Sequence, residues 1–144
     1  MPEAELDFKP VPELASFRQV ARHILDASQG LTGMMLAGVE NFATPDFRDR
    51  LKQHMSPLAE DCGAARLADE LSAQLEERLS VLAQQPPEFY SKIITRFDGQ
   101  QVTNLEMLET VKDHELTHRS QLFVYLRLKG MVPPTTRRRQ AAKA

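Results

Sequence analysis

The positions of the prolines most strongly limit what this chain can fold into. Nine prolines occur among its 144 residues, and they leave three long stretches in which a helix can run without interruption. In each stretch apolar residues recur at spacings of three, four and seven, which is the period of an amphipathic helix. The sequence therefore predicts long helices over about residues 17–40, 64–84 and 104–129.

Capping residues indicate where the helices begin. Ser16 is a favoured N-cap residue directly before the first periodic stretch. Thr103, followed three residues later by Glu106, has the spacing of a capping box. Thr44 and Pro45 predict the N-cap and the first residue of a short helix before the second long one.

The remaining signals concern helix ends and the link before the last helix. Asn41 is expected to end the first long helix, and Gly130 with the Pro133–Pro134 pair is expected to end the last. The β-branched residues near Ile93 and the turn dipeptide Asp98–Gly99 predict an extended excursion, a small hairpin. Three long helices and one short helix, joined by mostly short links, predict an all-α helix bundle.

These elements form a single domain over residues 1–144. Three prolines within residues 1–15 exclude a continuous helix, so this segment is expected to be an extended arm. Residues 16–134 are predicted to form the bundle, and residues 135–144 a basic flexible tail.

Composition excludes several classes of protein. The formal net charge of −2 disfavours sequence-independent binding of nucleic acid, and the basic run Arg137–Arg139 is most typical of a solvated tail. The lone Cys62 excludes an internal disulfide and favours a reducing compartment. There is no signal peptide pattern and no apolar run near the roughly 20 residues that a membrane span needs. We expect a soluble cytoplasmic protein without a membrane partner.

The segment His114–Glu115–Leu116–Thr117–His118 carries the clearest chemical signal. Two imidazoles four residues apart lie on one helical face, so both can bind the same ion. The residue pattern also matches the H-E-x-x-H signature of zinc proteases, which need a third protein ligand to the zinc ion. No Asp, Glu or His follows His118, and Gln121 and Val124 stand where the extended signature has glycine and histidine. A protease is therefore disfavoured.

His23 is the best candidate for a third ligand. Helical periodicity places it beside Ala27 and Gly30, whose small size leaves space for an ion, a water or a substrate. Burying unpaired imidazoles costs on the order of 1–3 kcal/mol each, whereas one shared ion satisfies them all. The fourth histidine, His54, is expected on the surface. The sequence thus predicts one divalent metal ion held by three histidines: His23, His114 and His118.

The end of the chain resembles the signature of the DinB/YfiT-like family, H-x-x-x-H-R-x-Q-L-x-x-Y-L-R-x-x-G-x-x-P-P. Residues 114–134, HELTHRSQLFVYLRLKGMVPP, match every named position. Upstream, residues 16–24 look like the helix that carries the family's first metal histidine, here His23. The resemblance covers roughly residues 10–134.

The resemblance implies a DinB-like four-helix bundle with one divalent ion on the same three histidines. Zinc is the ion we expect first, with nickel, manganese or iron as alternatives. Some members of the family are transferases that use bacillithiol or mycothiol, others are related to a maleylpyruvate isomerase, and several form dimers. The family name refers to damage-inducible expression.

One departure from the family concerns the start of the chain. Family members usually have a full helix before the first metal histidine, and here 22 residues containing three prolines precede His23. Either the given start omits that helix or the bundle is shortened. A homodimer is expected, because the absence of that helix would leave apolar flanks exposed and a partner subunit would cover them.

Three neutral imidazoles leave an open coordination position, as in catalytic zinc sites. A thiol bound there would lose its proton and attack an electrophile, or a bound water would hydrolyse a substrate. The residues do not choose between these reactions, and the resemblance favours a thiol transferase. The alternative from another class is a non-catalytic dimeric stress-response module with a structural or vestigial metal.

Five further residues are candidates for roles at this site. Glu115 and Tyr125 are the catalytic candidates. We predict substrate contacts from Arg119 and Arg127, which suit the carboxylates of a small thiol, and from Tyr125 and Gln121. Gln121 could instead orient a metal ligand. Simpler roles are an intrahelical ion pair between Glu115 and Arg119, and a core position for Tyr125.

Overall fold

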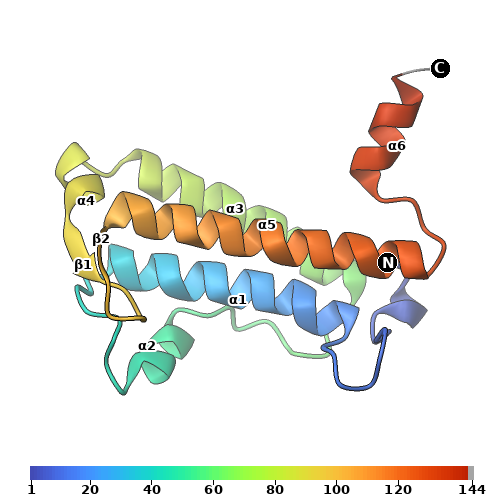
Figure 1. The fold of residues 1–144 in the computed structure, drawn as a ribbon, viewed down its shortest axis with the longest axis horizontal. Helices are drawn as coiled ribbons and strands as arrows, with labels where there is room; N and C mark the ends of the chain where they lie inside the picture. The colour runs from blue at the N-terminus through green and yellow to red at the C-terminus, as the bar shows by residue number, and fades with distance from the viewer. Residues whose placement is uncertain (143–144) are drawn as a thin grey trace.

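The computed structural model, which describes residues 1–142, is built around three long helices (Figure 1). They are α1 (Phe17–Leu36), α3 (Ala64–Ala83) and α5 (Asn104–Leu128). The shorter elements are a 3₁₀ turn (Glu3–Glu5), α2 (Phe47–Gln53), α4 (Pro87–Ser91), β1 (Ile93–Thr95), β2 (Gln101–Thr103) and α6 (Pro134–Ala141). The predicted all-α fold, with three long helices and a short one after the first, is confirmed.

Capping boxes begin α1 and α5; Ser16 was predicted as an N-cap and Thr103 with Glu106 as a capping box, and both predictions are confirmed. The Gln19 backbone N–H donates to Ser16 Oγ at 3.2 Å, and the Ser16 N–H donates to Gln19 Oε1 at 2.8 Å. Thr103 and Glu106 make the same reciprocal exchange at the start of α5. Each box supplies acceptors for backbone donors that have no partner within the helix.

Helix α1 ends earlier than expected, at Leu36 rather than near residue 40. Gly38 has a φ of 79°, the left-handed conformation that closes a helix and that glycine adopts without steric cost. Asn41, expected to end the helix, instead pairs with Thr95 of β1 in an isolated parallel bridge. Gly38, rather than Asn41, is therefore the residue that determines where α1 ends.

Three short helices begin where the sequence did not place them. Pro134, expected only to help end the last long helix, is the first residue of α6, and Pro87 is the first residue of α4. A proline suits this position because the first helical N–H has no intrahelical partner. The expected flexible tail is therefore helical over α6, and residues 143–144 lie outside the described part of the chain. Helix α2 has Asp46, not Thr44, at its N-cap position.

The expected excursion before α5 is an antiparallel hairpin of β1 and β2. Its turn contains Gly99, with a φ of 84°. Ile94 and Val102 pair across the hairpin, and both side chains are buried in a cluster that includes Met107 of α5. The hairpin therefore anchors the start of α5 at one end of the bundle (Figure 1).

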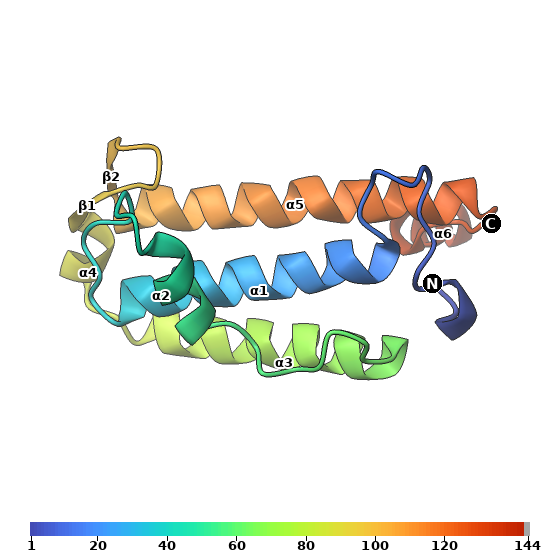
Figure 2. The ribbon, with the colours of Figure 1, turned by 90° about the horizontal axis from the view of Figure 1, so that it is seen from below.

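Helix α1 is central to the packing. It lies between α5 and α3 when the molecule is seen from below (Figure 2), and it packs against both. One buried cluster lies toward the hairpin, around Met34 and Met107, and a second joins Leu25 of α1 to Leu67 of α3. Within residues 1–142, no helix combines the length and apolar character needed to cross a membrane.

The short helix α2 and the residue after it pack on α1 at two glycines. A Cβ added at Gly30 would lie 2.5 Å from Leu51 Cδ1, and one added at Gly33 would lie 2.7 Å from His54 Cβ. Gly30 was expected to leave space beside His23, but Leu51 fills that space. His54 is half-buried against α1 rather than on the surface.

Replacing Gly33 with alanine should destabilise the protein by about 1–3 kcal/mol, although alanine is the better helix former. The new methyl group would overlap His54 Cβ, which is too close to the backbone to move aside. Urea unfolding of Gly33→Ala, His54→Gly and the double variant gives a thermodynamic cycle. The penalty should shrink in the His54→Gly background, and an equal penalty in both backgrounds would disprove the contact.

Candidate metal centre

Three histidines from two helices converge at the seam between α1 and α5. His23 Nε2 and His114 Nε2 are 3.0 Å apart, and the centroids of the three rings are 4.5–4.8 Å apart. One ligand atom each from His23, His114 and His118 lies within 4.8 Å of the others. Metal–nitrogen bonds of roughly 2.0–2.1 Å place neighbouring ligand nitrogens about 3.0–3.4 Å apart. The three side chains can therefore form a metal site with small adjustments.

The packing of α5 explains why the rings meet. His114 and His118 are one turn apart, and the buried residues Met107, Val111 and Tyr125 continue the same stripe on either side of them. This stripe lies against α1, so both imidazoles point toward the helix that carries His23. The apolar contacts between α1 and α5 thus set the positions of the imidazoles.

The surroundings favour neutral imidazoles. Partial burial lowers the pKa of His23 and of His114 from the ordinary value of 6.5, and the neighbouring His118 lowers both further. A lowered pKa keeps these rings unprotonated near neutral pH, which is the form that binds metal ions. The donor set therefore fits a divalent cation.

A hydrogen-bond chain orients His118. Its Nδ1 lies 2.9 Å from Gln121 Oε1, the Gln121 amide donates to Tyr125 Oη at 3.1 Å, and Tyr125 donates to the Ala15 carbonyl at 3.0 Å. Since a carbonyl oxygen only accepts, His118 carries its proton on Nδ1 and presents the Nε2 lone pair to the cluster. Gln121 and the buried Tyr125 thus fix the orientation of the His118 ring.

Glu115 lies on a different side of α5 from the histidines. Its carboxylate accepts hydrogen bonds from Ser28 Oγ and from Arg78 of α3, the latter at 2.7 Å. Among the described residues its ion pair is with Arg78, so the expected intrahelical pair with Arg119 is not formed. Glu115 is therefore held in the contact between α1, α3 and α5.

The two arginine candidates make their contacts with Phe123 and Thr136. Arg119 lies over the Phe123 ring, 5.8 Å from its centroid. Arg127 donates to the Phe123 carbonyl at 3.3 Å and to Thr136 Oγ1 at 3.4 Å, beside α6. Neither arginine is among the residues that line the hollow beside His23.

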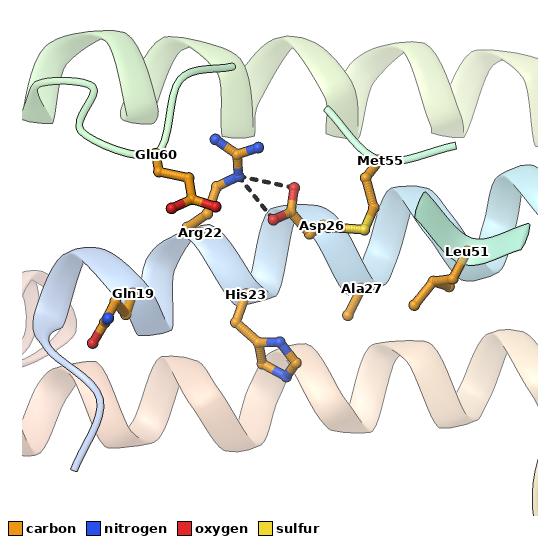
Figure 3. Close-up of a pocket in the computed structure, with 8 residues that line it drawn as sticks. All are labelled: Gln19, Arg22, His23, Asp26, Ala27, Leu51, Met55 and Glu60. Carbon is orange, nitrogen blue, oxygen red and sulfur yellow. Dashed lines mark hydrogen bonds and ion pairs between the residues drawn. The ribbon is translucent and has the colours of Figure 1, made fainter. Parts of the chain in front are cut away.

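That hollow has a volume of about 310 Å³ and is bounded by α1, α2 and the segment that leads to α3 (Figure 3). The side chains of Leu51 and Met55 lie toward one end of it, and those of Gln19 and Glu60 toward the other. His23 lies at its margin and points toward α5. A small molecule in the hollow would therefore lie next to His23, the one histidine of the three that lines it.

Arg22 shapes this hollow, and the sequence gave no sign of it. Its Nε contacts the Asp26 carboxylate at 2.8 Å, and its guanidinium donates to the carbonyls of Ser56 and Ala59 at 2.9 and 3.2 Å. These bonds tie the segment before α3 onto α1. Arg22 and Asp26 have the spacing of an ordinary helical ion pair, and the contacts to distant carbonyls leave no local pattern.

The family model described as the DinB family matches residues 1–144. The chain belongs to the DinB family. A solved structure of a DinB-like protein from Bacillus subtilis, YjoA, superposes with a TM-score of 0.68 at 20% identity, covering 91% of this chain and 80% of that chain. At that identity the likeness concerns the fold. No curated protein matches the chain. The expected DinB resemblance is thus confirmed.

Lowering the pH should destabilise the metal-free DinB chain. Because the folded-state pKa values of His23 and His114 lie below 6.5, the unfolded chain takes up protons first as the pH falls. Stability should decline as the pH falls below about 6.5 and level off below the lowered pKa values. Urea unfolding with EDTA from about pH 8 to 5 measures this. His23→Gln should show a shallower decline, and an unchanged decline would contradict the assignment.

Gln121→Leu should weaken binding of a divalent ion by about 10–100-fold, since His118 loses the acceptor that fixes its tautomer. Gln121→Glu keeps an acceptor at the same distance and serves as the matched control. Calorimetric titration with zinc compares the affinities of the two variants. Equal affinity of Gln121→Leu and the native protein would show that the contact does not orient the ligand.

Proposed function

We propose that this DinB-family chain binds one divalent ion through His23, His114 and His118 and acts as a transferase for a low-molecular-weight thiol. The convergence of the three imidazoles, with His23 at the margin of a hollow, is the observation that carries the proposal. Three protein ligands leave a position for a cosubstrate, whereas structural zinc sites use four. Zinc is the ion proposed first, with nickel, manganese and iron as alternatives.

A divalent ion in this position would lower the pKa of a coordinated thiol and so supply a nucleophile near neutral pH. The protein's own contribution is to place the reactants. Gln121 and Tyr125 hold His118 in the required tautomer. In the hollow, Leu51 and Met55 suit the apolar part of an electrophile, and Glu60 suits an amine or hydroxyl group of the thiol.

The thiol cosubstrate, of the bacillithiol or mycothiol type, is proposed from the resemblance to family members that use such thiols. Arg119 and Arg127 lie away from the hollow and have no part in this proposal.

Hydrolysis is a second use of the same site, with water in place of the thiol. The position of Glu115 disfavours the protease form of this chemistry. In an H-E-x-x-H protease the glutamate activates water at the metal, but here Arg78 and Ser28 occupy its carboxylate on another side of the helix. A hydrolase would have to use a different base.

A non-catalytic module is the second candidate function. An ion bound at the seam would cross-link α1 to α5, which are far apart in sequence, and would stabilise the bundle by mass action. Such a protein would bind the ion without turning over a substrate.

His118→Gln should abolish stoichiometric metal binding and lower thiol transfer by more than about 100-fold, since outer-shell changes alone cost 10–100-fold. His54→Gln, which changes a histidine outside the cluster, should leave both unchanged. Metal content is measured on protein purified without an affinity tag. Turnover is measured as conjugation of bacillithiol or mycothiol to monochlorobimane.

Two outcomes would change the proposal. One ion per chain with no turnover across a wide panel of thiols and electrophiles would favour the non-catalytic module. Retention of metal in His118→Gln would disprove the tri-histidine site itself.

A further inference from the structure

The groove between α3 and α5 contains two adjoining hollows. Both helices pack on α1, which lies between them in Figure 2. The hollows have volumes of about 400 and 300 Å³, and they share Leu75, Arg78 and Glu115 as lining residues. None of the three histidines of the metal centre lines either hollow. The groove is therefore a second candidate site, separate from the metal centre.

The smaller hollow has mainly apolar walls, which come from α3 and α5. Leu79 of α3 is 57% exposed, so these walls are open to solvent in the single chain. From Leu71 in the larger hollow to Leu82 in the smaller one, the groove follows about 16 Å of helix. The apolar residues of the smaller hollow are Leu75, Leu79, Leu82, Leu108 and Val111. A long apolar space of this kind suits a hydrocarbon chain.

Arg78 lines both hollows and has donors to spare. Its side chain is 15% exposed. Within residues 1–142 its hydrogen-bond partner is Glu115, at 2.7 Å. A guanidinium carries several N–H donors in a planar fork that matches a carboxylate. Since groups so nearly buried are usually hydrogen-bonded, the remaining donors of Arg78 favour a ligand that brings an acceptor.

Thr32 of α1 provides a second unpartnered group in the smaller hollow, which Arg78 also lines. Thr32 is 2% exposed, and its Oγ1 has no hydrogen-bond partner in the described part of the chain. Buried hydroxyls rarely lack a partner. Its hydroxyl is thus a further donor for a polar group of a ligand.

The charges in the groove favour an anion. Arg78 and Arg119 both line the larger hollow, where Glu115 is the one carboxylate among the lining residues. Arg119 has no ion pair within residues 1–142 and lies over the Phe123 ring. The larger hollow therefore has a net positive charge, and it adjoins the apolar hollow.

We infer that the groove binds a long-chain carboxylic acid. The carboxylate accepts hydrogen bonds from Arg78 and Thr32, and the positive charge of Arg119 attracts it. The hydrocarbon chain lies against the leucines of the smaller hollow. This site requires neither a metal ion nor thiol transfer, so it stands or falls independently of the function proposed above.

Fluorescence titration of the intact chain with cis-parinaric acid, a fluorescent long-chain acid, tests the inference. About one acid should bind per chain. Decanoate should displace it at a concentration at least about 10-fold lower than decanol, which has the same chain length but no charge. Equal displacement by the acid and the alcohol would overturn the assignment of the carboxylate.

Leu79→Glu should weaken binding of cis-parinaric acid at least about 10-fold, because it places a carboxylate against the hydrocarbon chain. Leu79 is largely exposed, so the variant should keep its helical circular dichroism. Val124→Glu, at a residue 51% exposed on α5 but outside both hollows, is the matched control and should bind as the native chain does. Unchanged affinity in Leu79→Glu would place the acid elsewhere.

The double variant Arg78→Met, Glu115→Gln removes both members of the ion pair and leaves no unpaired charge behind. Binding of the hydrocarbon chain should persist, but the preference for decanoate over decanol should fall at least several-fold. A preference that is unchanged would show that Arg78 does not bind the carboxylate.

Two controls exclude other locations and occupants. Glu60→Lys adds a positive charge to the hollow beside His23 and should leave binding of the acid unchanged. Tighter binding by this variant would place the acid in that hollow and overturn the inference. Affinity that falls as the protein concentration rises would show instead that another copy of the chain covers the groove.

Discussion

The packing of α1 against α5 determines whether this protein has a metal centre. His23 is 91 residues before His114 in sequence, and only this helix contact brings their Nε2 atoms to 3.0 Å. The contact is made by apolar residues on the same stripe as the imidazoles, including Met107 and Val111. A slip of α5 by one residue would rotate the stripe by about 100° and remove both of its histidines from the site. The positions of the three imidazoles therefore depend on the packing of the apolar core.

The same contact keeps the imidazoles of His23 and His114 neutral near neutral pH. Burial and mutual proximity lower the pKa of His23 and His114, so positive charge is disfavoured on the rings themselves. The chain of bonds from His118 through Gln121 and Tyr125 ends on the Ala15 carbonyl. The segment before α1 thereby helps to orient the His118 ring on α5.

Local sequence rules predicted the features that depend on neighbouring residues. The N-cap at Ser16, the capping box at Thr103, the hairpin turn at Gly99 and the apolar period of the long helices all follow from short-range chemistry. The convergence of the histidines was predictable because helical period and family resemblance pointed the same way. Helix α1 ends before Gly38 rather than at Asn41. Gly38 adopts the left-handed conformation that commonly closes a helix, and glycine adopts it more readily than asparagine does.

The features that sequence could not predict depend on distances between separate segments. Arg22 reaches carbonyls more than 30 residues away, and Glu115 pairs with Arg78 of another helix rather than with Arg119. Both contacts require the tertiary arrangement to exist first. Both also bear on the candidate site, because one shapes the hollow beside His23 and the other holds the Glu115 carboxylate on another side of α5 from the imidazoles.

X-ray absorption spectroscopy of the untagged protein with one equivalent of zinc tests the tri-histidine centre most directly. Convergence of the three imidazoles predicts three histidine nitrogens at roughly 2.0–2.1 Å, with the outer-shell scattering of imidazole rings and one or more light ligands from solvent. A spectrum that requires one imidazole or none would show that zinc binds elsewhere and would contradict the centre described above.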